Sequence, residues 1–154
     1  MQYLATVVEL TQARLTSPRP RRHTWMPVED AFRVVLIDDD PDLRKLVKLT
    51  LEFTAGWEVA TAADGTEGIE AVRNARPDVA VVDIMMPGMD GYEVCRRLKQ
   101  DPQTADIPVV FLTARKELDT ARMEAVGAAG VVVKPFNPDQ LAGELRALCE
   151  GEGT

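Results

Sequence analysis

The chain has 154 residues, a net charge of -7, one histidine and two cysteines. This length fits one compact domain with a short appendage and disfavours a two-domain enzyme. The acidity disfavours nucleic-acid or anionic-membrane binding by the main body, and the lone His23 excludes an internal His cluster for zinc. The longest stretch without a charged residue, Ala125 to Val133, has nine residues, whereas a membrane helix needs about 20 apolar ones. We therefore expect no membrane insertion.

The cysteines and the N-terminus predict a cytoplasmic protein. Cys95 and Cys149 match neither a metal-binding nor a disulfide-rich spacing, so we expect two small buried apolar side chains in a reducing compartment. The first residues lack the basic and apolar regions of a secretory signal.

Residues 1–31 differ from the rest of the chain, because they carry a net charge of +1 against -8 for residues 32–154. Residues 17–27 hold three prolines and three arginines, which indicates an extended linker. Residues 2–15 carry a helical apolar pattern, and so short a helix must dock or stay frayed. It could mediate dimers or partner docking, or be translated from a misassigned start, because Met26 directly precedes the domain. We predict an N-terminal extension over 1–31, a domain over 32–150 and a tail over 151–154. The residues of the helical pattern are Leu4, Val7, Val8, Thr11 and Leu15.

From residue 32 onward, five short apolar runs alternate with helical patterns, which predicts an α/β fold with a doubly wound parallel sheet. Four runs are almost wholly apolar, as in central strands that are covered on both faces, whereas the run around Glu58 alternates and indicates an edge strand. The runs are Val34–Ile37, Trp57–Ala60, Val79–Val82, Val109–Leu112 and Val131–Val133.

Two of the predicted helices have clear starts. Asp40 followed by Pro41 predicts an N-cap and a first helical residue, and Asn137 followed by Pro138 predicts the same for the last helix. The residues predicted to face inward are Leu43, Leu46, Val47, Thr50 and Leu51 in the first helix and Leu141, Leu145 and Leu148 in the last.

Reactive side chains stand where the predicted strands end, and the ends of parallel strands meet at one edge of a sheet. Asp38 and Asp39 follow the first strand, Asp83 ends the third, Thr113 the fourth and Lys134 the fifth. Clustered carboxylates repel one another unless a cation joins them, and ligands that are all oxygen favour Mg²⁺. A bound Mg²⁺ can neutralise the charge of a phosphoryl group, and Lys134 and the Thr113 hydroxyl could then contact the phosphate oxygens. A carboxylate can accept that group, and the position of Asp83 on a central strand favours it as the acceptor.

Four stretches in this order resemble a response-regulator receiver domain of two-component signalling. The similarity covers residues 33–149 and implies a flavodoxin-like strand order 2-1-3-4-5. The stretches run from Leu36 to Pro41, from Val81 to Gly91, from Phe111 to Ala114 and from Val133 to Phe136. Asp38, Asp83, Thr113 and Lys134 stand 45, 30 and 21 residues apart along them.

The resemblance also implies a role for each site residue. Asp83 matches the phospho-acceptor, Asp39 and Asp38 match Mg²⁺ ligands, and the Met85 carbonyl matches the backbone ligand. Thr113 matches the hydroxyl that turns toward the phosphate, and Lys134 the lysine that pairs with it. Pro135 matches a proline that follows a cis peptide bond.

The partners that the resemblance implies are a sensor histidine kinase or a histidine phosphotransfer protein, which donates from a phosphohistidine. No direct DNA binding by the receiver domain is expected, nor any enzymatic activity beyond phosphoryl acceptance and slow hydrolysis. The sequence ends at Thr154, shortly after the last predicted helix, so we expect a stand-alone receiver that acts on a separate, unknown output protein. A homodimer is compatible with this expectation.

One departure from the family keeps an alternative open. The position three before the lysine is commonly aromatic, but here it is Val131, which is stiff and has no ring to rotate inward. A receiver-like binding module that works without phosphorylation is therefore the second hypothesis. A more remote hypothesis is a haloacid-dehalogenase-like phosphatase, because the spacing of Asp38 and Asp40 imitates the paired aspartates of that family. We expect Asp40 to cap a helix instead, and Asp90 to shape the turn before Gly91.

Overall fold

The computed structural model describes residues 31–114 and 118–151 and contains the predicted five-stranded parallel sheet. The strands lie in the order β2-β1-β3-β4-β5, which confirms the expected flavodoxin-like arrangement. The predicted helix over 2–15, the linker over 17–27 and most of the predicted tail lie outside the described residues. The strands are β1 (Arg33–Ile37), β2 (Glu58–Ala62), β3 (Val79–Asp83), β4 (Val109–Thr113) and β5 (Gly130–Val133).

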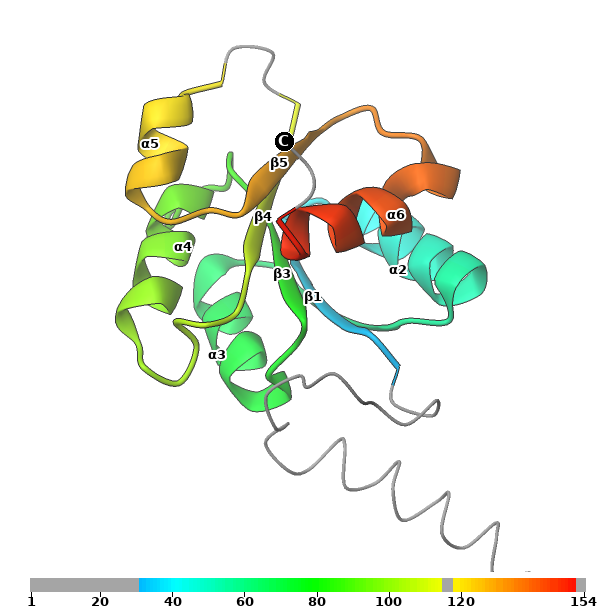
Figure 1. The fold of residues 1–154 in the computed structure, drawn as a ribbon, viewed down its shortest axis with the longest axis horizontal. Helices are drawn as coiled ribbons and strands as arrows, with labels where there is room; N and C mark the ends of the chain where they lie inside the picture. Colours follow the sequence, from blue (N-terminus) through cyan, green and yellow to red (C-terminus); the bar gives the residue numbers. More distant parts are fainter. Residues whose placement is uncertain (1–30, 115–117, 152–154) are drawn as a thin grey trace, which may run out of the picture.

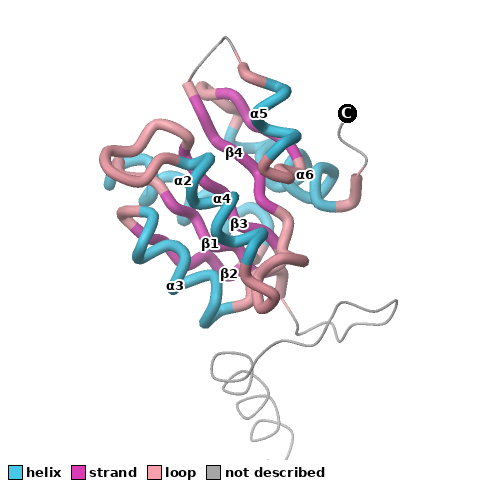
Figure 2. The backbone as a smooth tube through the Cα atoms, turned by 90° about the vertical axis from the view of Figure 1, so that its left-hand side faces the viewer, coloured by secondary structure: helices cyan, strands magenta, loops and turns pink. Residues whose placement is uncertain are grey.

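Helices cover both faces of the sheet. In Figure 1, α2 and α6 lie on one side of the strands and α3, α4 and α5 on the other, and Figure 2 shows the second group in front of the sheet. Each face has its own apolar core, because the side chains of a strand alternate between the two faces. The helices are α2 (Pro41–Ala55), α3 (Gly65–Ala75), α4 (Gly91–Gln100), α5 (Thr120–Ala125) and α6 (Pro138–Cys149).

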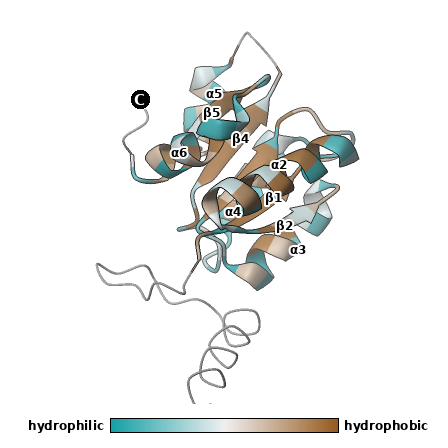
Figure 3. Cartoon of the chain, turned by 90° about the vertical axis from the view of Figure 1, so that its right-hand side faces the viewer, coloured by the Kyte–Doolittle hydropathy of each residue, from teal (hydrophilic) through white to brown (hydrophobic). Residues whose placement is uncertain are grey.

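The central strands β1, β3 and β4 are buried along their whole length, and Figure 3 shows their apolar character between the helices. The apolar run of β5 is typical of a central strand, but β5 is an edge strand, as the expected order 2-1-3-4-5 requires, and Val133 is 40% exposed. An apolar run reports cover on the faces of a strand and not the presence of a neighbour on each side, so it does not separate the two cases.

The predicted helix starts are confirmed. Asp40 Oδ1 accepts from the backbone N–H groups of Asp42, at 3.0 Å, and Leu43, at 3.3 Å, and Asn137 Oδ1 accepts from Asp139 N at 3.0 Å. Both caps satisfy donors that have no partner within the helix, so they define where α2 and α6 begin.

The predicted inward face of α2 is partly wrong. Val47 and Leu51 are buried as expected, but Leu46 is 48% exposed. Leu46 is one position from Val47 and therefore about 100° around the helix from it, which turns Leu46 away from the sheet. Elsewhere Leu141, Leu145 and Cys95 are buried as predicted, whereas Leu148 and Cys149 are only half-buried.

Within residues 31–114 and 118–151, no helix combines the length and apolar content that crossing a bilayer requires.

The two leucines of α2 should respond differently to truncation. Leu51→Ala leaves a cavity in a fully buried position, for which we expect a loss of about 2–5 kcal/mol in the free energy of unfolding. Leu46→Ala at the exposed position should cost at most about 0.5 kcal/mol. Urea denaturation of both variants measures the difference, and equal losses would contradict the observed orientation of α2.

Candidate functional site

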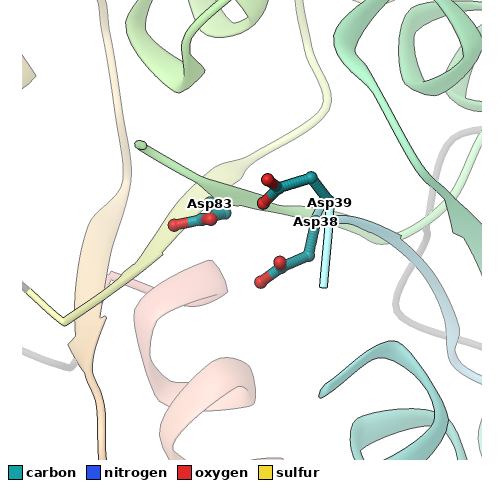
Figure 4. A group of neighbouring side chains, drawn as sticks. All are labelled: Asp38, Asp39 and Asp83. Atoms are coloured by element: carbon teal, nitrogen blue, oxygen red, sulfur yellow. The ribbon is translucent and has the colours of Figure 1, made fainter. Parts of the chain in front are cut away.

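Three carboxylates meet at the edge of the sheet where the central strands end. Asp38 and Asp39 directly follow β1, and Asp83 is the last residue of β3, which pairs with β1 in parallel. One carboxylate oxygen from each of the three lies within 4.8 Å of the others (Figure 4). The structure therefore brings together the three acids that the sequence predicted to meet, although 45 residues separate Asp38 from Asp83.

Asp38 is completely buried, and its polar atoms have several partners. Its Oδ1 accepts from Asp40 N at 2.9 Å, and its Oδ2 lies 3.2 Å from Lys134 Nζ. Its backbone carbonyl accepts from Arg44 Nη1 at 2.7 Å. Sequence reasoning missed Arg44, because an arginine in the second turn of a helix gives no sign of which carbonyl it contacts.

Thr113 is the last residue of β4, and Lys134 directly follows β5. Lys134 Nζ lies 3.8 Å from Asp83 Oδ1, so one ammonium group contacts both buried acids. Lys134 N also donates to Thr113 O at 2.7 Å. Thr113 is buried and lies one residue beyond Leu112, the register partner of Asp83. The peptide bond between Lys134 and Pro135 is cis, as expected.

The loop between β3 and α4 folds back closely over the end of β3. Met85 N is 3.4 Å from Asp83 Oδ1, and the Met85 side chain is exposed. Gly91 N donates to Ile84 O at 2.9 Å, and a Cβ added at Gly91 would lie 2.5 Å from Asp83 O. Only a glycine fits this approach, so Gly91 allows the loop to lie against the end of β3.

The neighbouring acids Asp40 and Asp90 have capping roles. Asp40 caps α2 and is not among the three clustered acids. This engagement supports the predicted cap and counts against the paired aspartates of a phosphatase. Asp90 was expected to shape a turn, and the structure shows more specifically that it is the N-cap of α4, since its Oδ1 accepts from Glu93 N at 2.9 Å.

The acids in this cluster repel one another. Burial, together with the charge of Asp38, raises the pKa of Asp83 from 3.8 to about 6, although Lys134 and the Met85 N–H act in the opposite direction. One lysine does not balance three carboxylates, and the cluster offers only oxygen ligands. These residues therefore fit a hard divalent cation such as Mg²⁺, which keeps several waters besides one or two carboxylates.

Comparison with known proteins agrees with this geometry. A family model described as the response regulator receiver domain matches residues 34–146. The DNA-binding dual master transcriptional regulator RpaA of Synechocystis sp. is 40% identical over 117 residues, which are 75% of this chain and 48% of RpaA. The DNA-binding response regulator MtrA of Mycolicibacterium smegmatis is 38% identical over 116 residues, 75% of this chain and 49% of MtrA.

Among solved structures, the chemotaxis protein CheY4 of Vibrio cholerae matches with a TM-score of 0.72 and 37% sequence identity, over 77% of this chain and 98% of CheY4. The chain therefore belongs to the response regulator receiver domain family of two-component signalling. It spans about half the length of the curated relatives it matches.

The raised pKa of Asp83 predicts a pH-dependent stability in the absence of divalent ions. The unfolded chain keeps the ordinary pKa near 3.8, so the proton on Asp83 stabilises the fold fully below about pH 4, and this contribution is lost as the pH rises through about 6. At about pH 8 with EDTA, Asp83→Asn should therefore be more stable than the parent chain by on the order of 2 kcal/mol. Thermal unfolding measures this gain, which should vanish below about pH 4.

Asp106→Asn is the matched control for this experiment, because Asp106 is exposed and lies outside the acidic cluster. We expect it to change the melting temperature little at either pH. A destabilised Asp83→Asn at about pH 8 would contradict the repulsion between the buried acids.

Gly91 should tolerate no side chain. We expect Gly91→Ala to lower the free energy of unfolding by about 1–3 kcal/mol, because the added Cβ collides with the backbone of Asp83. Gly143→Ala in α6 is the control, since no atom lies within 4 Å of its added Cβ and alanine favours a helix. Chemical denaturation distinguishes the two, and a neutral Gly91→Ala would refute the close approach.

Proposed function

We propose that this receiver domain is a signalling switch that accepts a phosphoryl group on Asp83 in a Mg²⁺-dependent reaction. The observation that carries the proposal is the position of the Asp83 carboxylate, 3.8 Å from Lys134 Nζ and clustered with Asp38 and Asp39. The donor is a phosphohistidine on a sensor histidine kinase or a histidine phosphotransfer protein. His23 lies outside residues 32–150, which we propose as the receiver domain, so this domain contains no histidine of its own to act as the donor.

The proposed step forms one bond and breaks one. An oxygen of the ionised Asp83 carboxylate attacks the phosphorus, and the phosphorus–nitrogen bond of the donor breaks. The electron pair of that bond stays on the imidazole nitrogen of the donor, which becomes neutral or takes a proton from water according to its initial charge. The product is an aspartyl phosphate, whose slow hydrolysis by water returns inorganic phosphate and resets Asp83.

The chain supplies ligands and charge for this step. Asp38, Asp39, Asp83 and the Met85 carbonyl would hold Mg²⁺, which neutralises charge on the transferred group when it is bound. Lys134 Nζ, which contacts Asp38 and Asp83, is placed to pair with a phosphate oxygen once Asp83 carries it. The Thr113 hydroxyl is proposed as a further donor to the phosphate. Arg44 positions the site by holding the carbonyl of Asp38.

The output is proposed to be a change in the partner-binding surface formed by α5, β5 and α6. A separate protein or a second copy of the chain would bind the changed surface. Val131 bears on how that change arises. It lies in β5 opposite Phe111 of β4 and packs against the core around Phe111. A valine cannot swing a ring into the site, so movement of the loop that follows Thr113 would have to transmit the signal.

Val131 also supports a second candidate function, a binding module that does not depend on phosphorylation. The two functions differ in the effect of Asp83→Asn on the affinity for a captured partner. A switch predicts that beryllofluoride, a phosphate mimic, changes the affinity of the parent chain and leaves that of Asp83→Asn unaltered. Equal affinity of the parent chain and of Asp83→Asn, each with and without beryllofluoride, would favour the binding module.

Incubation with acetyl phosphate and Mg²⁺ tests the chemistry directly. We expect intact-protein mass spectrometry to show the addition of one phosphoryl group, which is absent in Asp83→Asn because the amide is not a phosphoryl acceptor. EDTA should also abolish the mass gain, since the carboxylates then lack their cation.

Asp90→Asn is the matched control, because Asp90 lies in the loop after β3 and asparagine also caps helices well. It should be phosphorylated like the parent chain. Undiminished labelling of Asp83→Asn, or no labelling of the parent chain, would contradict the proposal.

A further inference from the structure

The outer surface of α2 carries an apolar stripe, formed by Leu46, Leu49 and Phe53, that no described residue covers. These side chains are 48%, 45% and 84% exposed, and they account for three of the five large apolar side chains found exposed in the described part of the chain. Their spacing of three and four residues places them on one face of the helix. Val47 and Leu51 bury the opposite face against the sheet, so the stripe is additional to the core.

The sequence of the same chain contains a second apolar pattern, which predicts a helix with one apolar face. Leu4, Val7, Val8 and Leu15 recur at helical spacing over residues 2–15. A helix of this length is marginal by itself in water and gains most of its stability from packing its apolar face. It would extend about 21 Å, whereas the stripe on α2 spans about 10 Å along its axis, so one such helix can cover the stripe.

The chain enters the domain next to the C-terminal end of α2. The ring of Phe32 lies 4.3 Å from that of Trp57, and Trp57 N donates to Leu51 O in the last turn of α2. Arg33, the first residue of β1, is in register with Glu58, just after α2 ends. Phe53, the most exposed member of the stripe, belongs to that same end of the helix.

The linker between the two apolar faces has a suitable length. Sixteen residues, 16–31, connect the predicted helix to Phe32. A Pro-rich chain of that length spans up to about 50 Å in its extended form, which is more than enough to reach back along α2. A tether that can span the two faces raises the effective concentration of the helix at the stripe to about the millimolar range, which favours docking over that of a separate peptide.

We propose that residues 2–15 dock as an amphipathic helix on the stripe formed by Leu46, Leu49 and Phe53. The contact is intramolecular and covers the outer face of α2, the helix whose N-cap, Asp40, directly follows Asp38 and Asp39. It does not depend on phosphorylation of Asp83, so its test is separate from that of the proposed function. A second copy of the chain, using the same stripe, is the competing occupant.

Disulfide trapping in the full chain tests the docking. Leu4→Cys, Val8→Cys and Leu15→Cys are each combined with Leu49→Cys in a Cys149→Ser background, so that one pair meets whichever way the docked helix runs. The remaining Cys95 is buried. Glu67→Cys in α3 replaces Leu49→Cys as the matched control, because Glu67 is exposed on a helix that covers the other face of the sheet. We expect at least one pair with Leu49→Cys to form an intramolecular disulfide about tenfold faster than its Glu67→Cys control.

Phe53→Ser, added to the fastest pair, should slow the cross-link to the rate of the control. Because the Phe53 side chain is 84% exposed, the domain should stay folded, which circular dichroism checks in the same samples. Three results would overturn the proposal: equal rates for all pairs and controls, no effect of Phe53→Ser, or a disulfide-linked dimer whose yield grows with protein concentration. The last result would assign the stripe to a second copy.

Discussion

Repulsion between the buried carboxylates of Asp38 and Asp83 is the constraint on which the functional part of this structure depends. Both acids are withdrawn from water, and this burial, together with the smaller effect of the charge of Asp38, raises the pKa of Asp83 to about 6. Lys134 offsets part of the repulsion by contacting both acids. The repulsion that remains favours a cation bound between the three carboxylates.

The parallel sheet makes this arrangement attainable. Every strand ends at the same edge, so residues at the ends of β1, β3, β4 and β5 converge without any local contact between them in the sequence. Backbone contacts then hold them in place. Arg44 holds the carbonyl of Asp38, and Gly91 lets the loop after β3 pack on Asp83. The site is therefore built at the ends of regular strands and on the loop that follows β3.

Much of the fold was predictable because its signals are local. Proline after Asp40 and Asn137 marked the two helix starts, and both caps are formed as expected. Apolar runs marked the strands but did not separate the edge strand β5 from the central strands, and only the resemblance to a known strand order did so. Leu46 was likewise predicted to face inward, but it is exposed. The apolar pattern of a helix does not show how far around the helix its neighbours extend, so it cannot separate Leu46 from the buried residues.

The sequence by itself determined the kinds of residue at the strand ends, and thus that carboxylates, a hydroxyl and a lysine are available for phosphoryl chemistry. Only the tertiary structure decided how they meet: one ammonium group is shared by Asp38 and Asp83, and the carbonyl of Asp38 is held by Arg44. It also showed that no described residue covers the apolar stripe around Phe53. The physical reason is that residue type follows from the chain alone, whereas distance, burial and the resulting pKa depend on neighbours supplied by distant segments.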